Sequence, residues 1–112
     1  PTLNLRECFG EEKIIILAIP SKGIKAVSKE IKNFHRISNR YVLASKGIDL
    51  DTFKTMSETL STEANIDSNK IFVLSGPNLA EEVSENFSTA SVLAGENLDE
   101  AKMISNFSSK NL

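Results

Sequence analysis

The chain has 112 residues, of which 40% are hydrophobic and 25% are charged, and its formal net charge is −2. These values fit one soluble globular domain with a core, and they exclude disordered and fibrous proteins. The longest unbroken apolar run, residues 14–19, is far shorter than the ~18–20 residues that cross a bilayer, so we expect no membrane insertion. The single cysteine, Cys8, cannot form a disulfide within the chain, which makes the cytoplasm the expected location.

Basic residues are concentrated between residues 21 and 46. That segment holds seven lysines and arginines and one acidic residue, whereas residues 47–112 hold four basic and eleven acidic residues. Four of the lysines recur every three or four residues, opposite Ile24, Val27 and Ile31, as in an amphipathic helix with its charges in water. No aromatic residues alternate with these lysines to stack on bases, so we expect no nucleic-acid partner.

Strand-like and helix-like segments alternate along the chain. A strand buried on both faces is predicted over Lys13–Ile19, a helix over residues 21–34 and a short strand over Tyr41–Ser45. Asp51 is the predicted N-cap of the next helix, in which Phe53, Met56, Leu60 and Ala64 recur at helical spacing. The remaining predicted elements are a strand over Ile71–Leu74, a short helix over residues 78–86, a strand over Thr89–Ala94 and a last helix.

Asn97 is the predicted N-cap of that last helix. Glu100 follows three residues later, as in a capping box, and Ala101, Ile104 and Phe107 are predicted to face inward. The whole alternation predicts an α/β fold with a mostly parallel sheet and flanking helices.

Ligands of such sheets bind beyond the carboxyl ends of the strands. The predicted strand ends lead into residues 19–23, 45–49 and 75–80, and each of these three loops contains a glycine and a hydroxyl side chain. Glycine lets backbone N–H groups approach a ligand, and Lys46 adds a positive charge. The loops together therefore indicate a site for a phosphate or another small anion, although Gly47 or Gly76 taken singly is more typical of a simple turn.

Other reactive residues carry weaker indications. His35 stands alone near a helix end, where an imidazole complements the helix dipole. Cys8 has only Arg6 as a basic neighbour, which does not favour a nucleophile, and the adjacent Glu81 and Glu82 point apart on a helix. No group of His, Cys and carboxylate residues has metal-ligand spacing, and no dinucleotide, P-loop or nucleophile-elbow motif is present.

Three blocks of sequence resemble one enzyme family. They are Ile-Ile-Leu-Ala-Ile-Pro-Ser at residues 15–21, Leu-Ala-Ser-Lys-Gly-Ile at residues 43–48, and Val-Leu-Ser-Gly-Pro-Asn-Leu-Ala-Glu-Glu-Val at residues 73–83. Their order and spacing are similar to those of the bacterial-type NAD(P)-dependent glycerol-3-phosphate dehydrogenases, over a stretch from about Lys13 to Phe107. The third block is the most specific of the three.

The resemblance implies a Rossmann-like cofactor domain that binds NAD or NADP. It also implies hydride transfer between dihydroxyacetone phosphate and sn-glycerol 3-phosphate, for glycerophospholipid synthesis, in a homo-oligomeric parent protein. The family's glycine-rich loop is expected upstream of Pro1, and its helical substrate domain, with the general-base lysine, beyond Leu112. Residues 1–112 would then form part of one domain and be inactive alone.

Site residues follow from the same resemblance. Lys46 matches a lysine that contacts both cofactor and substrate, and electrostatic positioning of the phosphorylated substrate suits it better than a general-base role. Gly76 and Asn78 match substrate-binding positions. The positions that match cofactor contacts are Pro20, Ser21 and Ala80. Leu79 and Ser88 depart from the family, where phenylalanine and proline are common.

Two alternatives stay open at this point. Another NAD(P)-dependent oxidoreductase similar to 6-phosphogluconate dehydrogenase would share the fold and differ in its substrate. A non-catalytic nucleotide- or anion-binding module would need no further domain.

Overall fold

A computed structural model describes residues 1–77, 80–88 and 90–111, with the backbone alone for residues 110 and 111. Strands β1 (Ile14–Leu17), β2 (Arg40–Leu43) and β3 (Ile71–Ser75) pair in parallel and in that order, and β4 (Val92–Ala94) pairs antiparallel with β3. The α-helices are α1 (Ser21–Ile31), α2 (Met56–Ala64), α3 (Ala80–Ser84) and α4 (Leu98–Asn111). Two short 3₁₀ helices, η1 (Leu5–Cys8) and η2 (Ser68–Lys70), complete the elements of the described ranges.

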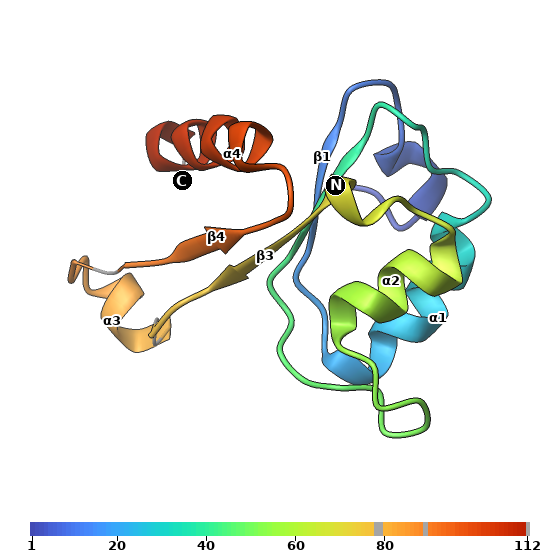
Figure 1. Cartoon of the computed structure of the whole chain (residues 1–112). Helices are drawn as coiled ribbons and strands as arrows, with labels where there is room; N and C mark the ends of the chain where they lie inside the picture. The colour runs from blue at the N-terminus through green and yellow to red at the C-terminus, as the bar shows by residue number, and fades with distance from the viewer. Residues whose placement is uncertain (78–79, 89, 112) are drawn as a thin grey trace.

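The sheet lies between two helical layers. Helices α1 and α2 lie side by side on one face of the sheet, and α4 crosses the other face (Figure 1). Successive right-handed crossovers that advance in one direction across a sheet place their helices on the same face, which explains why α1 and α2 are neighbours. The predicted α/β fold with a mostly parallel, Rossmann-like sheet is confirmed.

Each face of the sheet has its own core. Leu17, Tyr41 and Leu43 alternate along β1 and β2 toward α1 and α2, where they pack with Ile24 and Leu60. The opposite face packs more sparsely, through a cluster consisting of Val42, Phe72, Ala101 and Ile104. Because successive side chains of a strand point to opposite faces of the sheet, the same strands contribute residues to both cores.

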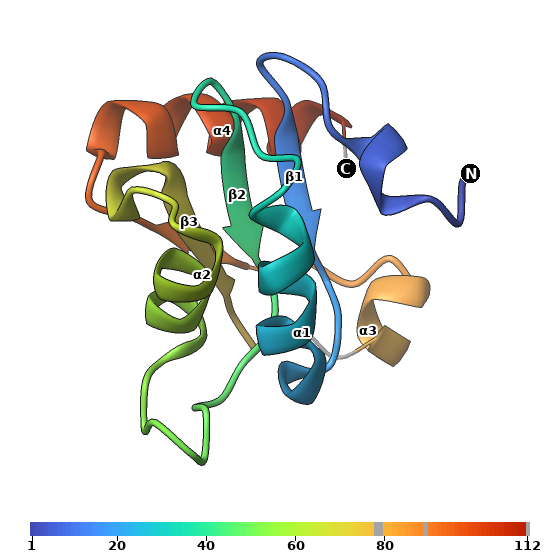
Figure 2. The same ribbon diagram turned by 90° about the vertical axis from the view of Figure 1, so that its right-hand side faces the viewer.

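The prediction that the first strand is buried on both faces is wrong. Ile16 is 49% exposed, whereas Leu17 beside it is 6% exposed. Ile14 packs on the α4 side, so the alternation places Ile16 on that side too, and α4 crosses the sheet near the amino ends of the strands (Figure 2). The carboxyl half of β1 therefore has no helix over this face in the described chain.

The start of α2 also differs from the prediction. Thr55, not Asp51, is the N-cap: its hydroxyl accepts from the Glu58 amide at 3.3 Å, and Glu58 accepts from the Thr55 amide at 2.8 Å. Phe53 lies outside the helix, is 77% exposed and has a φ of 57°. Residues 48–55 form a loop closed by an antiparallel bridge between Ile48 and Thr55, and this loop occupies the predicted first turn of the helix.

Smaller differences occur elsewhere. Helix α1 ends at Ile31 rather than at residue 34, and β4 begins at Val92 rather than at residue 89. In α4, Ala101 and Ile104 are buried as predicted, whereas Phe107 is 57% exposed. The Asn97 side chain accepts from the Glu100 amide at 3.1 Å as predicted, but the Glu100 carboxylate turns toward basic side chains instead of completing a capping box.

Those basic side chains join α4 to the sheet. The Arg40 guanidinium donates from Nε and Nη2 to the two Glu100 oxygens at 3.0 and 2.6 Å, and Lys70 Nζ lies 3.3 Å from Oε1. These side chains are 18–24% exposed, so solvent screens them only partly. The hydrogen bonds from Arg40, helped by Lys70, hold the pKa of the Glu100 carboxyl below its ordinary value.

Replacing Glu100 tests this junction. A carboxylate with a lowered folded-state pKa contributes stability that is present above its unfolded pKa, 4.5, and is lost as the pH falls through the folded value. We expect Glu100→Gln to lower the free energy of unfolding by about 1–2 kcal/mol at pH 7 and to flatten its decline between about pH 6 and pH 3. Urea denaturation across this range measures both, with the exposed Glu85→Gln as the control. Parallel curves for wild type and Glu100→Gln would contradict the assignment.

Candidate functional site

The carboxyl ends of β1, β2 and β3 meet at one edge of the sheet, because the three strands run parallel (Figure 2). The chain leaves these ends through residues 18–20, 44–49 and 76–77. All three loops that the sequence singles out as ligand-binding candidates therefore belong to one edge. The antiparallel strand β4 leaves the sheet at the opposite edge.

Hydrogen bonds tie the central loop to its two neighbours. The Ala44 amide donates to the Leu17 carbonyl at 3.0 Å, and the Ser45 hydroxyl donates to the Ile19 carbonyl. On the other side, Lys46 Nζ donates to the Gly76 carbonyl at 3.3 Å. The loop that carries Lys46 thus lies between the other two strand ends and is bonded to both.

Gly47 allows the close approach of this loop to α1. Its φ is +133°, a region that residues with a Cβ rarely adopt, and a Cβ placed there would lie 3.4 Å from Cβ and Oγ of Ser21. Ser21 is the first residue of α1, after the exposed N-cap residue Pro20, whose side chain makes no capping bond. The amide groups of the first helical turn consequently face this edge without a side-chain acceptor from the N-cap.

The charge at this edge is positive. Lys46 is exposed, its hydrogen-bond acceptor is a neutral carbonyl, and it makes no ion pair within the described ranges. Asp49, the nearest acid along the chain, is paired with Lys25 at 3.3 Å. Its carboxyl accepts the Asp51 amide, and this bond together with Lys25 holds the pKa of Asp49 below its ordinary value. Asp49 is therefore ionised, and Lys25 balances its negative charge. The positive charge of Lys46 is left available to an anion.

The structure brings most of the predicted site residues together. Pro20, Ser21, Lys46 and Gly76 all lie at the three joined strand ends. Ala80 is exposed and begins α3, and no hydrogen bond joins it to the three loops among the described residues. Asn78 lies outside the described residues.

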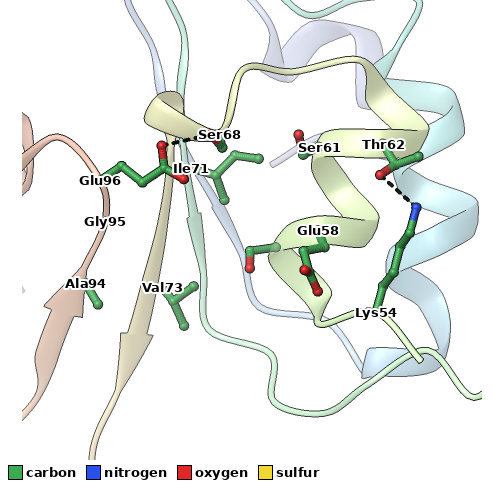
Figure 3. A pocket seen from close by; sticks show the side chains of 11 residues that line it. Lys54, Glu58, Ser61, Thr62, Ser68, Ile71, Val73, Ala94, Gly95 and Glu96 are labelled. Carbon is green, nitrogen blue, oxygen red and sulfur yellow. Dashed lines mark hydrogen bonds between the residues drawn. The ribbon is translucent and has the colours of Figure 1, made fainter. Parts of the chain in front are cut away.

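Sequence reasoning missed two cavities. The larger, of about 470 Å³, lies between α2 and strands β3 and β4 and holds none of the predicted site residues (Figure 3). Several of its polar groups are paired with one another, Lys54 with Thr62 at 3.2 Å and Ser68 with Glu96 at 3.0 Å. The second, of about 420 Å³, lies beside the start of α1.

That second cavity adds Lys22, Lys25 and Asp49 to the neighbourhood of Ser21. Asp49 belongs to one of the strand-end loops singled out in the sequence, but its pairing with Lys25 spans 24 residues and carries no local signal.

Within the described residues, no three His, Cys, Asp or Glu side chains gather as metal ligands, and no helix has the length and apolar character needed to cross a membrane.

Comparison with known proteins identifies the family. A family model described as the N-terminus of NAD-dependent glycerol-3-phosphate dehydrogenase matches residues 1–101. The chain belongs to this family. It is 38% identical over 96 residues to the glycerol-3-phosphate dehydrogenase [NAD(P)+] of Fusobacterium nucleatum, and 36% identical over 103 residues to that of Clostridium botulinum strain Eklund 17B. The resemblance inferred from the three sequence blocks is thereby confirmed.

Two solved structures share the fold. The crystal structure of glycerol-3-phosphate dehydrogenase from Coxiella burnetii superposes with a TM-score of 0.75 at 27% identity, covering 90% of this chain and 30% of that one. DsGPDH of Dunaliella salina reaches the same TM-score, 0.75, at 19% identity, which shows the fold alone. The alignments cover 86% and 92% of this chain but only 29% and 30% of the two bacterial relatives named above.

Gly47→Ala tests the close packing of the central loop. The positive φ makes any Cβ strained there, and the Cβ would also touch Ser21 at 3.4 Å, so we expect a loss of about 1–3 kcal/mol in the free energy of unfolding. Gly23→Ala is the matched control, because a Cβ at this helical position meets only Ile19 Cδ1 at 3.6 Å. Alanine should leave stability unchanged or raise it there. Urea denaturation gives both values, and equal effects of the two substitutions would contradict the strained geometry at Gly47.

Proposed function

We propose that this chain supplies part of the cofactor-binding domain of a glycerol-3-phosphate dehydrogenase. The whole enzyme would interconvert dihydroxyacetone phosphate and sn-glycerol 3-phosphate by hydride transfer with NAD or NADP, and so serve glycerophospholipid synthesis. Membership of the family and the names of the relatives support the reaction. The glycine-rich loop and the helical substrate domain would belong to other parts of a polypeptide of the relatives' length.

The observation that carries the proposal is the bond from Lys46 Nζ to the Gly76 carbonyl at 3.3 Å. It brings a cation and the backbone of a second strand-end loop together at the carboxyl edge of a parallel sheet, where ligands of such folds bind. A phosphate group there would replace a neutral carbonyl by an anion as the partner of Lys46, which is a stronger, charge-assisted hydrogen bond. Lys46 would contact cofactor and substrate, and Gly76 and Asn78 the substrate.

The residues at this edge fit an anionic dinucleotide. Lys46 has no competing carboxylate in the described ranges, and α1 begins at the same edge with no side-chain cap from its N-cap residue, Pro20. Pro20, Ser21 and Ala80 would take part in holding the cofactor, and the nicotinamide, when bound, would give or accept the hydride. The contribution of Lys46 is electrostatic, because a fixed ammonium stabilises the phosphate without any proton transfer.

The proposal extends to the cellular setting. A cytoplasmic location is supported by the single cysteine, which excludes a disulfide within the chain. We also propose that the whole dehydrogenase is a homo-oligomer, which light scattering on the purified enzyme measures directly.

The reaction itself is tested with the full-length dehydrogenase that contains this chain. We expect it to oxidise NADH or NADPH when dihydroxyacetone phosphate is added, with absorbance at 340 nm as the readout. Dihydroxyacetone without its phosphate should be turned over much more slowly, because Lys46 then has no substrate phosphate to bind. An enzyme that is silent with both cofactors would contradict the proposed function.

The role of Lys46 is tested separately in the same enzyme. Loss of a charge-assisted hydrogen bond of about 1.5–3 kcal/mol should lower kcat/KM for dihydroxyacetone phosphate by roughly 10- to 100-fold in Lys46→Ala. Lys29→Ala removes an equally exposed lysine from the last turn of α1, at the far end of the helix, and should leave kcat/KM unchanged. Near-normal kinetics of Lys46→Ala would refute its role.

A further inference from the structure

We propose that Asp49, through its ion pair with Lys25, is a positioning residue that fixes the direction of Lys46. The inference rests on the proposed function, because it assigns to Lys46 the task of meeting a phosphate. Asp49 would touch neither substrate nor cofactor. It would act by holding the backbone from which Lys46 projects.

The ion pair attaches the central loop to α1. Asp49 Oδ2 lies 3.3 Å from Lys25 Nζ, and the Asp49 side chain is only 9% exposed. Lys25 lies one turn into α1, a helix whose Ile24 and Ile31 are buried in the core. A helix anchored in this way is a rigid point of attachment for a loop at the edge of the sheet.

The loop behind Asp49 is itself a closed unit. The Asp49 amide donates to the Lys54 carbonyl at 2.8 Å, the Phe53 amide donates to the Asp49 carbonyl at 2.7 Å, and the Asp51 amide donates to Asp49 Oδ1 at 2.9 Å. Every one of these bonds has Asp49 as a partner. The Lys25–Asp49 pair therefore fastens the whole turn of residues 49–54, not a single side chain, to α1.

Lys46 lies between two attachments. The Ser45 hydroxyl bonds to the Ile19 carbonyl before it, and the Asp49 carboxylate binds Lys25 after it. Gly47, next to Lys46, has the conformational freedom of glycine and adopts a φ of +133°. Without the second attachment, rotation about Gly47 would let the Lys46 backbone turn away from Gly76. The two attachments together hold Lys46 over the third strand end.

The burial of Asp49 separates this pair from an ordinary surface salt bridge, although the Lys25 side chain is 35% exposed. Asp51 is also within 3.7 Å of Lys25, but its side chain is 85% exposed, and such contacts contribute little. The Asp49 side chain is almost covered. Asp49 raises the pKa of Lys25, and the bond from the Asp51 amide together with Lys25 lowers the pKa of Asp49, so the pair favours both charges. Loss of either charge would leave the other without its main partner.

The kinetic test uses Asp49→Asn in the full-length dehydrogenase, since asparagine keeps the oxygen that accepts the Asp51 amide and replaces the oxygen that faces Lys25 by an uncharged NH2 group. We expect KM for dihydroxyacetone phosphate to rise roughly three- to tenfold while kcat stays within about twofold, and Lys25→Met should reproduce this. Lys25→Arg should retain most of the wild-type KM. Glu100→Gln breaks an ion pair remote from the site and should leave KM unchanged.

A double substitution shows whether Asp49 acts through Lys46. In the Lys46→Ala background, Asp49→Asn should have no further effect on KM, because the group that it directs is gone. An unchanged KM in Asp49→Asn, or an undiminished effect in the Lys46→Ala background, would overturn the proposal.

A second measurement needs no enzymatic activity. Amide hydrogen exchange of the full-length dehydrogenase, followed by NMR, should show the Asp49 and Phe53 amides exchanging at least about tenfold faster in Asp49→Asn, with the Val42 amide of β2 unchanged. Unaltered exchange at Asp49 and Phe53 would overturn the positioning role. An inactive wild-type dehydrogenase would contradict the proposed function alone, and the exchange comparison would still decide whether the ion pair fastens the loop.

Discussion

The parallel pairing of β1, β2 and β3 is the constraint on which the rest of the molecule depends. Parallel strands need a crossover after each strand, and two successive right-handed crossovers place α1 and α2 together on one face. The same pairing brings three carboxyl ends to one edge, so residues distant in sequence become neighbours there. Lys46 reaches Gly76, 30 residues away, only because β2 and β3 run side by side.

Ion pairs serve different purposes at the two ends of this sheet. Near the amino ends, Arg40 and Lys70 hold Glu100 and with it α4, so charge there supports the packing of a helix that covers a small apolar cluster. Near the carboxyl ends, Lys25 neutralises Asp49, whereas Lys46 bonds only to the neutral Gly76 carbonyl and makes no ion pair in the described ranges. Neutralising an acid near Lys46 adds to the positive potential that Lys46 supplies at this edge.

Much of the fold could be predicted because its signals are local. The apolar run before Pro20, the amphipathic spacing of α1 and the glycine-containing strand ends are all visible within a few residues of sequence. The predicted N-cap of α2 is wrong because Asp51 and Thr55 are both good capping residues, and only the bridge from Ile48 to Thr55 decides between them. The exposure of Ile16 and Phe107 depends on where α4 crosses the sheet, which no local pattern contains.

The residues of the candidate site also fall into two groups, those that local sequence signals predict and those that depend on packing. Lys46, Gly76, Pro20 and Ser21 could be chosen from the sequence because each lies at a predicted strand end, and parallel topology alone brings strand ends together. The Lys25–Asp49 pair could not, since it depends on how a helix of one crossover meets the loop of the next. It emerges only from the packing of α1 against residues 48–55.

The central claim is that an anionic ligand binds at the three joined strand ends and is met by Lys46. A crystal structure of the full-length dehydrogenase with the nicotinamide cofactor and glycerol 3-phosphate tests it most directly. The expected result is a phosphate oxygen within about 3 Å of Lys46 Nζ, the distance of a charge-assisted hydrogen bond. A ligand seated instead in the cavity between α2 and β4, with Lys46 still bonded to the Gly76 carbonyl alone, would contradict it.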